Sequence, residues 1–327
     1  MPWRLIGFFC ITYLTLRIAL NNMKKVFSIW KDTSFLAGRP REDFLAYNAQ
    51  QGAFVVADGV GLWEGIEYMG KYPRSSGSGR LSLAFCEAFT HHFTRHPHAK
   101  VADGFMAGNA AAKEVNRDRS KYNVFRKHRG LFAATAAMAR VDGQTLHWAH
   151  ICDAGVMVIG ANGKVKLHKD GCRHHFPWPN DVRGYELSMW TLFVRTLVRN
   201  AISKENELLG YGVITGEPEV ERYVESGTYR LSPNDIVVLH TDGFAPYLAL
   251  PEFRKRIIQL ESQSELRGVV EDFIEKKTAS LRKALQGHRV DGRASVEVIE
   301  GKLREILGKR FREVEWAKEK SLIIVKI

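Results

Sequence analysis

The sequence predicts an α+β protein with a large sheet at its centre. Strand-like apolar runs occur in groups, pairs of amphipathic helical segments separate the groups, and the order lacks the strict strand–helix alternation typical of parallel sheets. The 327 residues are long for one domain but within its range, and 45% hydrophobic with 26% charged residues is the composition of a globular protein. We therefore expect one domain over residues 23–327, preceded by an apolar extension over residues 1–22.

Strands are predicted from two kinds of pattern. Residues 25–30 alternate between apolar and polar side chains, and residues 53–57 form a continuous apolar run. An Asp-Gly pair at 142–143 and an Asn-Gly pair at 162–163 predict tight hairpin turns. Further strands are expected at 132–141, 145–151, 155–159, 165–168, 227–231, 236–240 and 321–327.

Helices are predicted where apolar residues recur every three to four positions. The expected helices span residues 78–93, 101–115, 186–202, 266–285 and 296–307. The first two are separated by Pro97 and follow a strand-like run, which predicts a helix pair that packs on the sheet.

Acidic residues stand at the ends of several strand-like runs. Residues 53–57 lead into Asp58, residues 236–241 lead into Asp242, and Asp153 follows the run that ends at 151. Carboxylates at the rim of a sheet are held rigidly near one another, and Mg²⁺ and Mn²⁺ prefer such oxygen ligands. Two such ions about 4 Å apart lower the pKa of a bridging water for attack on a phosphoryl group. Taken alone, an Asp-Gly pair after a strand favours a simple turn, but two instances that both follow an apolar strand weaken that interpretation.

Six segments resemble, in order, the motifs of the metal-dependent protein phosphatases of the type-2C (PPM) class. The segments are Arg41-Glu42-Asp43, FVVADGVG at 54–61, FMAGNAAAKEVN at 105–116, AATAAMARV at 133–141 with WAHICDAG at 148–155, DIVVLHTDGFAPYL at 235–248, and KEKSLIIVKI at 318–327. This resemblance implies a four-layer αββα sandwich, in which helix pairs flank two central antiparallel sheets. It also implies a site for two Mn²⁺ or Mg²⁺ ions, and a peripheral third, in the cleft at one end of the sandwich.

The resemblance further implies a role for each site residue. The implied metal-site residues are Glu42, Asp43, Asp58, Gly59, Asp153 and Asp242, with Asp58 bridging both ions and Asp153 contributing to the third. Arg39 or Arg41 is implied to grip the substrate phosphate as a bidentate fork. A water that bridges the two ions would attack phosphoserine or phosphothreonine in line, without a covalent phosphoenzyme.

Several positions depart from the family pattern. Lys318 stands where the last metal-binding Asp is expected, and Glu319 takes that role only if the strand entry shifts by one residue, which turns side chains to the opposite face. Cys152 replaces a usual Gly, and Val60 replaces the His that would protonate the leaving group. Two hypotheses remain: an active phosphoprotein phosphatase, and a catalytically impaired pseudophosphatase that binds phosphoproteins as a regulatory module.

The charge balance favours acidic binding partners but does not choose between them. The chain carries 48 Lys and Arg against 36 Asp and Glu, a net charge of +12, which favours acidic partners such as phosphorylated protein, nucleic acid or anionic membrane. Without a zinc module or a basic motif interleaved with aromatics, we expect no specific nucleic-acid binding. The basic segments 266–285 and 302–312 are interpreted as solvated helix faces, with docking of an acidic partner as the alternative.

The remaining features concern compartment and membrane contact. Residues 5–20 are apolar but short and contain Arg17. Three interpretations stay open for this segment: a weak membrane anchor, a buried or interfacial helix, and an upstream extension of the domain, which we favour. We expect no membrane contact through other parts of the chain. The four cysteines are widely spaced, which is typical of a cytoplasmic protein, and we expect a monomer. A second group of residues could in principle bind a metal ion: His168, Cys172, His174 and His175. Their spacing matches no zinc-binding pattern, so we interpret them as part of a His-rich loop.

Overall fold

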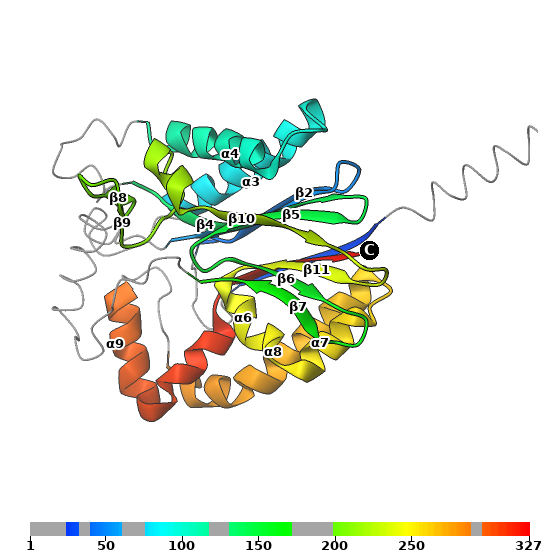
Figure 1. The fold of residues 1–327 in the computed structure, drawn as a ribbon. Helices are drawn as coiled ribbons and strands as arrows, with labels where there is room; N and C mark the ends of the chain where they lie inside the picture. Colours follow the sequence, from blue (N-terminus) through cyan, green and yellow to red (C-terminus); the bar gives the residue numbers. More distant parts are fainter. Residues whose placement is uncertain (1–23, 33–39, 61–75, 118–130, 172–198, 289–295) are drawn as a thin grey trace, which may run out of the picture.

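The computed structural model describes residues 24–32, 40–60, 76–117, 131–171, 199–288 and 296–327. Within this part of the chain, two antiparallel five-stranded sheets lie face to face between two layers of helices (Figure 1). The predicted α+β class and the four-layer arrangement implied by the resemblance are therefore confirmed.

The strand order differs from the order along the chain in both sheets. The first sheet runs β1 (Lys25–Lys31), β12 (Lys320–Lys326), β11 (Ile236–His240), β6 (Gly155–Ile159) and β7 (Val165–Lys169). The second runs β10 (Glu225–Arg230), β5 (Thr145–Ile151), β4 (Ala134–Asp142), β3 (Ala53–Gly59) and β2 (Phe44–Asn48). A small pair, β8 (Ala201–Ile202) and β9 (Leu208–Leu209), lies outside these sheets.

Helices cover the outer face of each sheet. Helices α3 (Gly77–Arg95) and α4 (Val101–Val115) pack on the second sheet. The first sheet is covered by α6 (Ala245–Leu248), α7 (Pro251–Ile258) and α8 (Gln263–Leu285), and α9 (Val296–Leu307) packs on α8 together with the 3₁₀ segment Gly308–Ala317. Among the helices in the described ranges, none is long and apolar enough to cross a bilayer.

Alternation along the strands creates the layers of the core. In β11, Ile236 and Val238 face the helices, whereas Val237 and Leu239 face the second sheet. Period-two alternation places apolar side chains on both faces of this strand, because both faces are covered. The sequence therefore reads as a continuous apolar run where the strand is fully buried.

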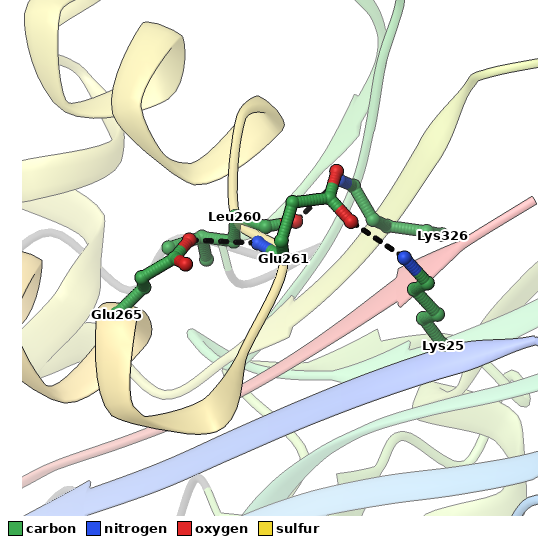
Figure 2. A network of polar contacts seen from close by, with 5 residues as sticks. All are labelled: Lys25, Leu260, Glu261, Glu265 and Lys326. Carbon is green, nitrogen blue, oxygen red and sulfur yellow. Dashed lines mark hydrogen bonds and ion pairs between the residues drawn. The ribbon is translucent and has the colours of Figure 1, made fainter.

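Polar contacts fasten the start of α8 to the edge of the first sheet. Figure 2 shows Lys25 of β1 and Lys326 of β12 pointing at the segment before the helix. Lys25 Nζ donates to Glu261 Oε2 at 2.5 Å, and the Glu261 amide donates to Glu265 Oε2 at 2.8 Å. The hydrogen bond from Lys25 is the main reason why the pKa of Glu261 is lowered. Such exposed contacts contribute little stability but fix where the chain enters the helix.

Some elements were not predicted, and one prediction is wrong in part. Strand β2 and the short helices α6 and α7 were missed because each is too short for a clear period. The predicted helix at 186–202 lies mostly outside the described residues, but its last two residues form β8 instead. The apolar segment 5–20 lies wholly outside the described residues, so membrane contact there stays a prediction.

Asn109 of α4 and Asn116, the C-cap residue of that helix, join α4 to Phe132 and to the segment 215–217. Asn116 Nδ2 donates to the carbonyls of Phe132 and Thr215, at 2.8 and 2.9 Å, and its Oδ1 accepts the Phe132 amide at 2.9 Å. Asn109, two turns earlier, likewise accepts from the Gly216 amide at 2.9 Å. The Asn-containing helix of the family resemblance thus holds the segment 215–217 through buried hydrogen bonds, an arrangement called the clamp below.

We expect Asn116→Ala to lower the free energy of unfolding by about 3 kcal/mol, because three buried hydrogen bonds are lost and their backbone partners are left unpaired. Urea unfolding followed by circular dichroism measures this. The control is Met106→Ala, an exposed position on the same helix, which should change stability by less than about 0.5 kcal/mol. Equal effects of the two substitutions would contradict the clamp.

Candidate functional site

Acidic side chains from both sheets meet at one end of the sandwich. In the first sheet, His240 pairs with Leu322 and with Gly155, so the end of β11 lies beside the starts of β12 and β6. In the second sheet, the pairing of Gly59 with Ala134 places the end of β3 beside the start of β4. The predicted acidic residues lie at this end: Asp43 before β2, Asp58 in β3, Asp153 between β5 and β6, and Asp242 directly after Thr241.

These carboxyl groups crowd one another strongly. Burial and the neighbouring charge of Glu319 raise the pKa of Asp43 well above its ordinary value. Burial raises the pKa of Asp58 in the same way, with added repulsion from Asp43, Asp242 and Asp153. The side chains of Asp43 and Asp58 are also close enough to each other to affect each other's pKa. Without a cation, these two carboxyl groups therefore keep their protons to a higher pH than carboxyl groups ordinarily do.

Asp153 reaches the same cluster from an unusual backbone position. The surrounding atoms desolvate its carboxylate and Asp242 repels it, so the pKa of Asp153 is raised although the residue retains an exposed surface. The preceding residue, Cys152, has a φ of 62°, in the left-handed region that favours glycine. This conformation explains why a Gly is usual at that position in the family that the sequence resembles.

Thr241 connects the acidic cluster to both sheets. Its hydroxyl donates to Asp43 Oδ2 at 2.6 Å and accepts the Ser321 amide at 2.9 Å. Thr241 and Ser321 are both buried. Asp43, which precedes the second sheet, is thereby held against the first sheet. The two sheets cannot separate at this point without breaking a buried hydrogen bond.

Lys318 occupies the far side of the cluster. Its Nζ donates to Asp242 Oδ2 at 2.8 Å, and both side chains are partly exposed. The backbone here is close-packed, since a Cβ on Gly243 would lie 2.2 Å from the carbonyl oxygen of Glu319. Lys318 stands where the family resemblance implies a metal-binding carboxylate. Its ammonium group instead contacts Asp242, another of the implied metal ligands.

Glu319 points to a different set of partners. One of its oxygens accepts from Trp30 Nε1 at 2.7 Å, and its carboxylate also accepts the amides of Glu42 and Asp43 at 3.1 Å. Burial raises the pKa of Glu319 against these hydrogen bonds. In the structure, Glu319 is therefore hydrogen-bonded to Trp30 and to the backbone of residues 42–43. Its role as a metal ligand stays a prediction.

Glu42 and Arg41 are also held by specific contacts. Ser76, the N-cap of α3, donates to Glu42 Oε1 at 2.6 Å, which places a carboxylate at the positive end of that helix. The Arg41 guanidinium lies 4.5 Å from the Trp30 ring centre and 4.2 Å from that of Phe44, and its Nε donates to the carbonyl of Asp43 at 2.8 Å. Arg39 lies outside the described residues.

Three supporting residues were missed by sequence reasoning: Ser76, Thr241 and Lys320. Thr241 directly precedes the predicted Asp242, and a hydroxyl at that position was the only sequence signal that could have indicated its supporting role. Lys320 is buried, and burial lowers its pKa to about 8. Its ammonium donates to the carbonyls of Trp316 and Lys318 and so fixes the backbone from which Lys318 reaches out.

The donor set fits a divalent cation. Asp43, Asp58, Asp153 and Asp242 carry up to four negative charges, and among the described residues Lys318 is the cation that contacts them directly. Carboxyl groups whose pKa values are raised by burial and by neighbouring carboxylates mark a place where positive charge is needed. Hard oxygen donors of this kind suit Mg²⁺ or Mn²⁺.

The comparisons with known proteins concern the fold. No protein-family model and no curated protein match the sequence. The photosystem II phosphatase PBCP matches with 14% identity and a TM-score of 0.51, over 93% of this chain and 98% of that chain. PppA, described as a key regulatory component of T6SS in Pseudomonas aeruginosa, matches with 11% identity and a TM-score of 0.50, over 94% and 99%. The catalytic domain of the serine/threonine protein phosphatase PstP, solved with two manganese ions, matches with 14% identity and a TM-score of 0.43, over 93% and 97%.

At these identities the likeness concerns the fold alone. The chain has the fold of the type-2C serine/threonine phosphatases, as its sequence motifs predicted. Activity and substrate must be argued from the residues of the site.

Lys318→Ala should tighten Mn²⁺ binding by about tenfold or more, because it removes a cation that repels the incoming ion at Asp242. Glu319→Gln should change the affinity less, since its carboxylate is engaged with Trp30 and the 42–43 backbone. Isothermal titration with Mn²⁺ compares the two variants. A larger loss of affinity in Glu319→Gln would instead show that Glu319 is a ligand.

Metal affinity should also depend on pH. The raised pKa values of Asp43 and Asp58 mean that an entering cation displaces protons, so affinity rises with pH and falls in acid. Each displaced proton contributes up to about tenfold per pH unit below the raised pKa. Mn²⁺ titrations at pH 6, 7 and 8, in buffers of different ionisation enthalpy, measure both affinity and proton release. An affinity that does not change with pH would contradict the raised pKa values of Asp43 and Asp58.

Proposed function

We propose that this protein is a metal-dependent phosphatase that hydrolyses phosphoserine and phosphothreonine in proteins. The observation that carries the proposal is the convergence of Asp43, Asp58, Asp153 and Asp242 at one end of a type-2C phosphatase fold, where burial and mutual repulsion raise the pKa of the first three. The basic net charge of +12 supports an acidic substrate such as a phosphoprotein.

The proposed roles follow from the contacts of each residue. Asp58, with the Gly59 carbonyl and Asp43 beside it, would hold the cation, and Asp242 and Asp153 would complete the negative rim. A divalent cation bound there supplies charge that stabilises the phosphoryl group and makes water a better nucleophile at neutral pH. Thr241 fixes the Asp43 carboxylate, and Glu319 fixes the backbone of 42–43, so the ligands are positioned before substrate arrives.

Phosphate binding is assigned to arginine. Arg39 is the proposed phosphate-binding residue, because Arg41 is stacked on Trp30 and Phe44 and donates to the Asp43 carbonyl. In the proposed reaction the leaving group takes its proton from water, since Val60 stands where a His would donate it. This predicts turnover that is slow for leaving groups of high pKa.

A second function, a pseudophosphatase that binds phosphoproteins without hydrolysis, is favoured by one observation. Lys318 forms an ion pair with Asp242 at 2.8 Å, at a position where the family uses a carboxylate to bind metal. An ammonium group there neutralises part of the charge and can contact a phosphate directly. In this alternative the site recognises the phosphorylated residue but lacks a full metal complement.

Asp58→Asn should lower Mn²⁺-dependent hydrolysis of p-nitrophenyl phosphate and of a phosphothreonine peptide by about 1000-fold or more. The reason is that the change removes a charge at the centre of the cluster, while the amide keeps the size of the side chain. The fold should be retained, as circular dichroism will show. The matched control is Asp272→Asn, an exposed position on α8, which should leave turnover unchanged.

The same assay separates the two functions. Metal-dependent turnover by the wild type that is lost in Asp58→Asn supports the phosphatase. Folded wild type without turnover, which binds the phosphothreonine peptide but not the unphosphorylated peptide, supports the pseudophosphatase. Undiminished hydrolysis by Asp58→Asn would refute the site itself.

A further inference from the structure

A second group of metal-binding side chains lies on the helix-covered face of the first sheet. His168 belongs to the edge strand β7, Asp170 follows that strand, and His240 is the last residue of β11. One ligand atom from each lies within 4.8 Å of the others, and His168 Nε2 is 3.0 Å from Asp170 Oδ2. The three residues are far apart along the chain, and the sheet brings them together.

A glycine on the strand between them makes this meeting geometrically feasible. Strand β6 separates β7 from β11, and Gly155 of β6 pairs with His240. A Cβ on Gly155 would lie 2.3 Å from His240 Nε2 and 3.0 Å from Asp170 Cβ. Because this strand position has no side chain, the groups on either side reach across β6 toward each other.

The tautomer of His240 leaves a lone pair directed at this space. Its Nδ1 lies 3.1 Å from the Thr241 carbonyl oxygen, and a carbonyl only accepts, so Nδ1 carries the proton. His240 is fully buried, and its Nε2 has no hydrogen-bond partner among the described residues. A buried nitrogen without a partner is costly, and an imidazole oriented by an Nδ1–H to carbonyl bond is the usual arrangement of a metal ligand.

We propose that His168, Asp170 and His240 bind a transition-metal ion, of which Zn²⁺ is the representative, at a site separate from the acidic cluster. Two imidazoles and one carboxylate match zinc coordination, whereas Mg²⁺ selects oxygen donors alone. His168 and Asp170 are 40% and 37% exposed, so an ion enters from solvent and a fourth position stays open to water. Small side-chain rotations at these two exposed residues close the ligand atoms around the ion.

Binding at this site would couple to the structure around it. The ion would tie the edge strand β7 to the central strand β11, across β6. His240 lies two residues before Asp242, so the ion would stiffen the strand end from which the acidic cluster is built. A ligand that binds only the folded state raises its stability, so Zn²⁺ should raise the melting temperature.

The test is isothermal titration of the full chain with Zn²⁺ in excess Mg²⁺, which occupies the oxygen-rich cluster. We expect one Zn²⁺ per chain for the wild type and an affinity at least about tenfold weaker in His168→Ala and in Asp170→Asn. The matched control is His91→Ala, an exposed histidine on α3, which should bind as the wild type does. Because His168 is exposed on an edge strand, its removal should leave the fold intact.

A second probe separates this site from others that bind zinc. Co²⁺ bound to the wild type should give the visible absorption of a nitrogen-ligated ion, and this absorption should persist in Asp58→Asn but disappear in His168→Ala. Zn²⁺ affinity unchanged by His168→Ala, or no zinc binding by folded wild type, would overturn the proposal. Neither readout depends on hydrolysis, so failure of the proposed phosphatase activity would leave this test intact.

Discussion

The structure depends on holding mutually repelling carboxyl groups together at one end of a two-sheet sandwich. Burial raises the pKa values of Asp43 and Asp58, and Asp153 and Asp242 add repulsion at Asp58. Such crowding is unfavourable in itself, and it persists because the two sheets fix the positions of the strand ends. The buried hydrogen bond from Thr241 to Asp43 links the sheets at this point, together with the hydrogen bonds from the amides of Glu42 and Asp43 to Glu319. A cation would relieve the repulsion, which is why this end is the functional candidate.

The Lys318 side chain determines how much of the acidic cluster is free to bind a metal ion. Its ammonium contacts Asp242, so one end of the cluster already carries a cation, whereas Asp43 and Asp58, whose pKa values are raised, lie at the other end. Lys320 supports this arrangement from behind, because its buried ammonium binds the carbonyl of Lys318. The proposed cation site is therefore centred on Asp58. An ion beside Asp242 would have to displace the lysine, which sets the cost of a second ion.

Much of this could be predicted from the sequence because local patterns specify local structure. Helix α4 spans the predicted residues, since its apolar period and the break at Pro97 are both local signals. Asp58, Asp153 and Asp242 were found because each follows an apolar run, whereas Asp43 was found through the family resemblance. The roles of Glu319 and Thr241 could not be predicted, because they depend on partners more than 190 residues away, in the backbone of 42–43 and in the Asp43 carboxylate. The His168–His240 proximity is set by sheet order, which the sequence does not specify.

The most direct test of the central claim is a crystal structure of the full chain grown with Mn²⁺, with anomalous diffraction data collected at the manganese absorption edge. The account predicts an anomalous peak coordinated by Asp58, beside Asp43 and the Gly59 carbonyl, with Lys318 Nζ still paired with Asp242. A map with no manganese at Asp58 would contradict it.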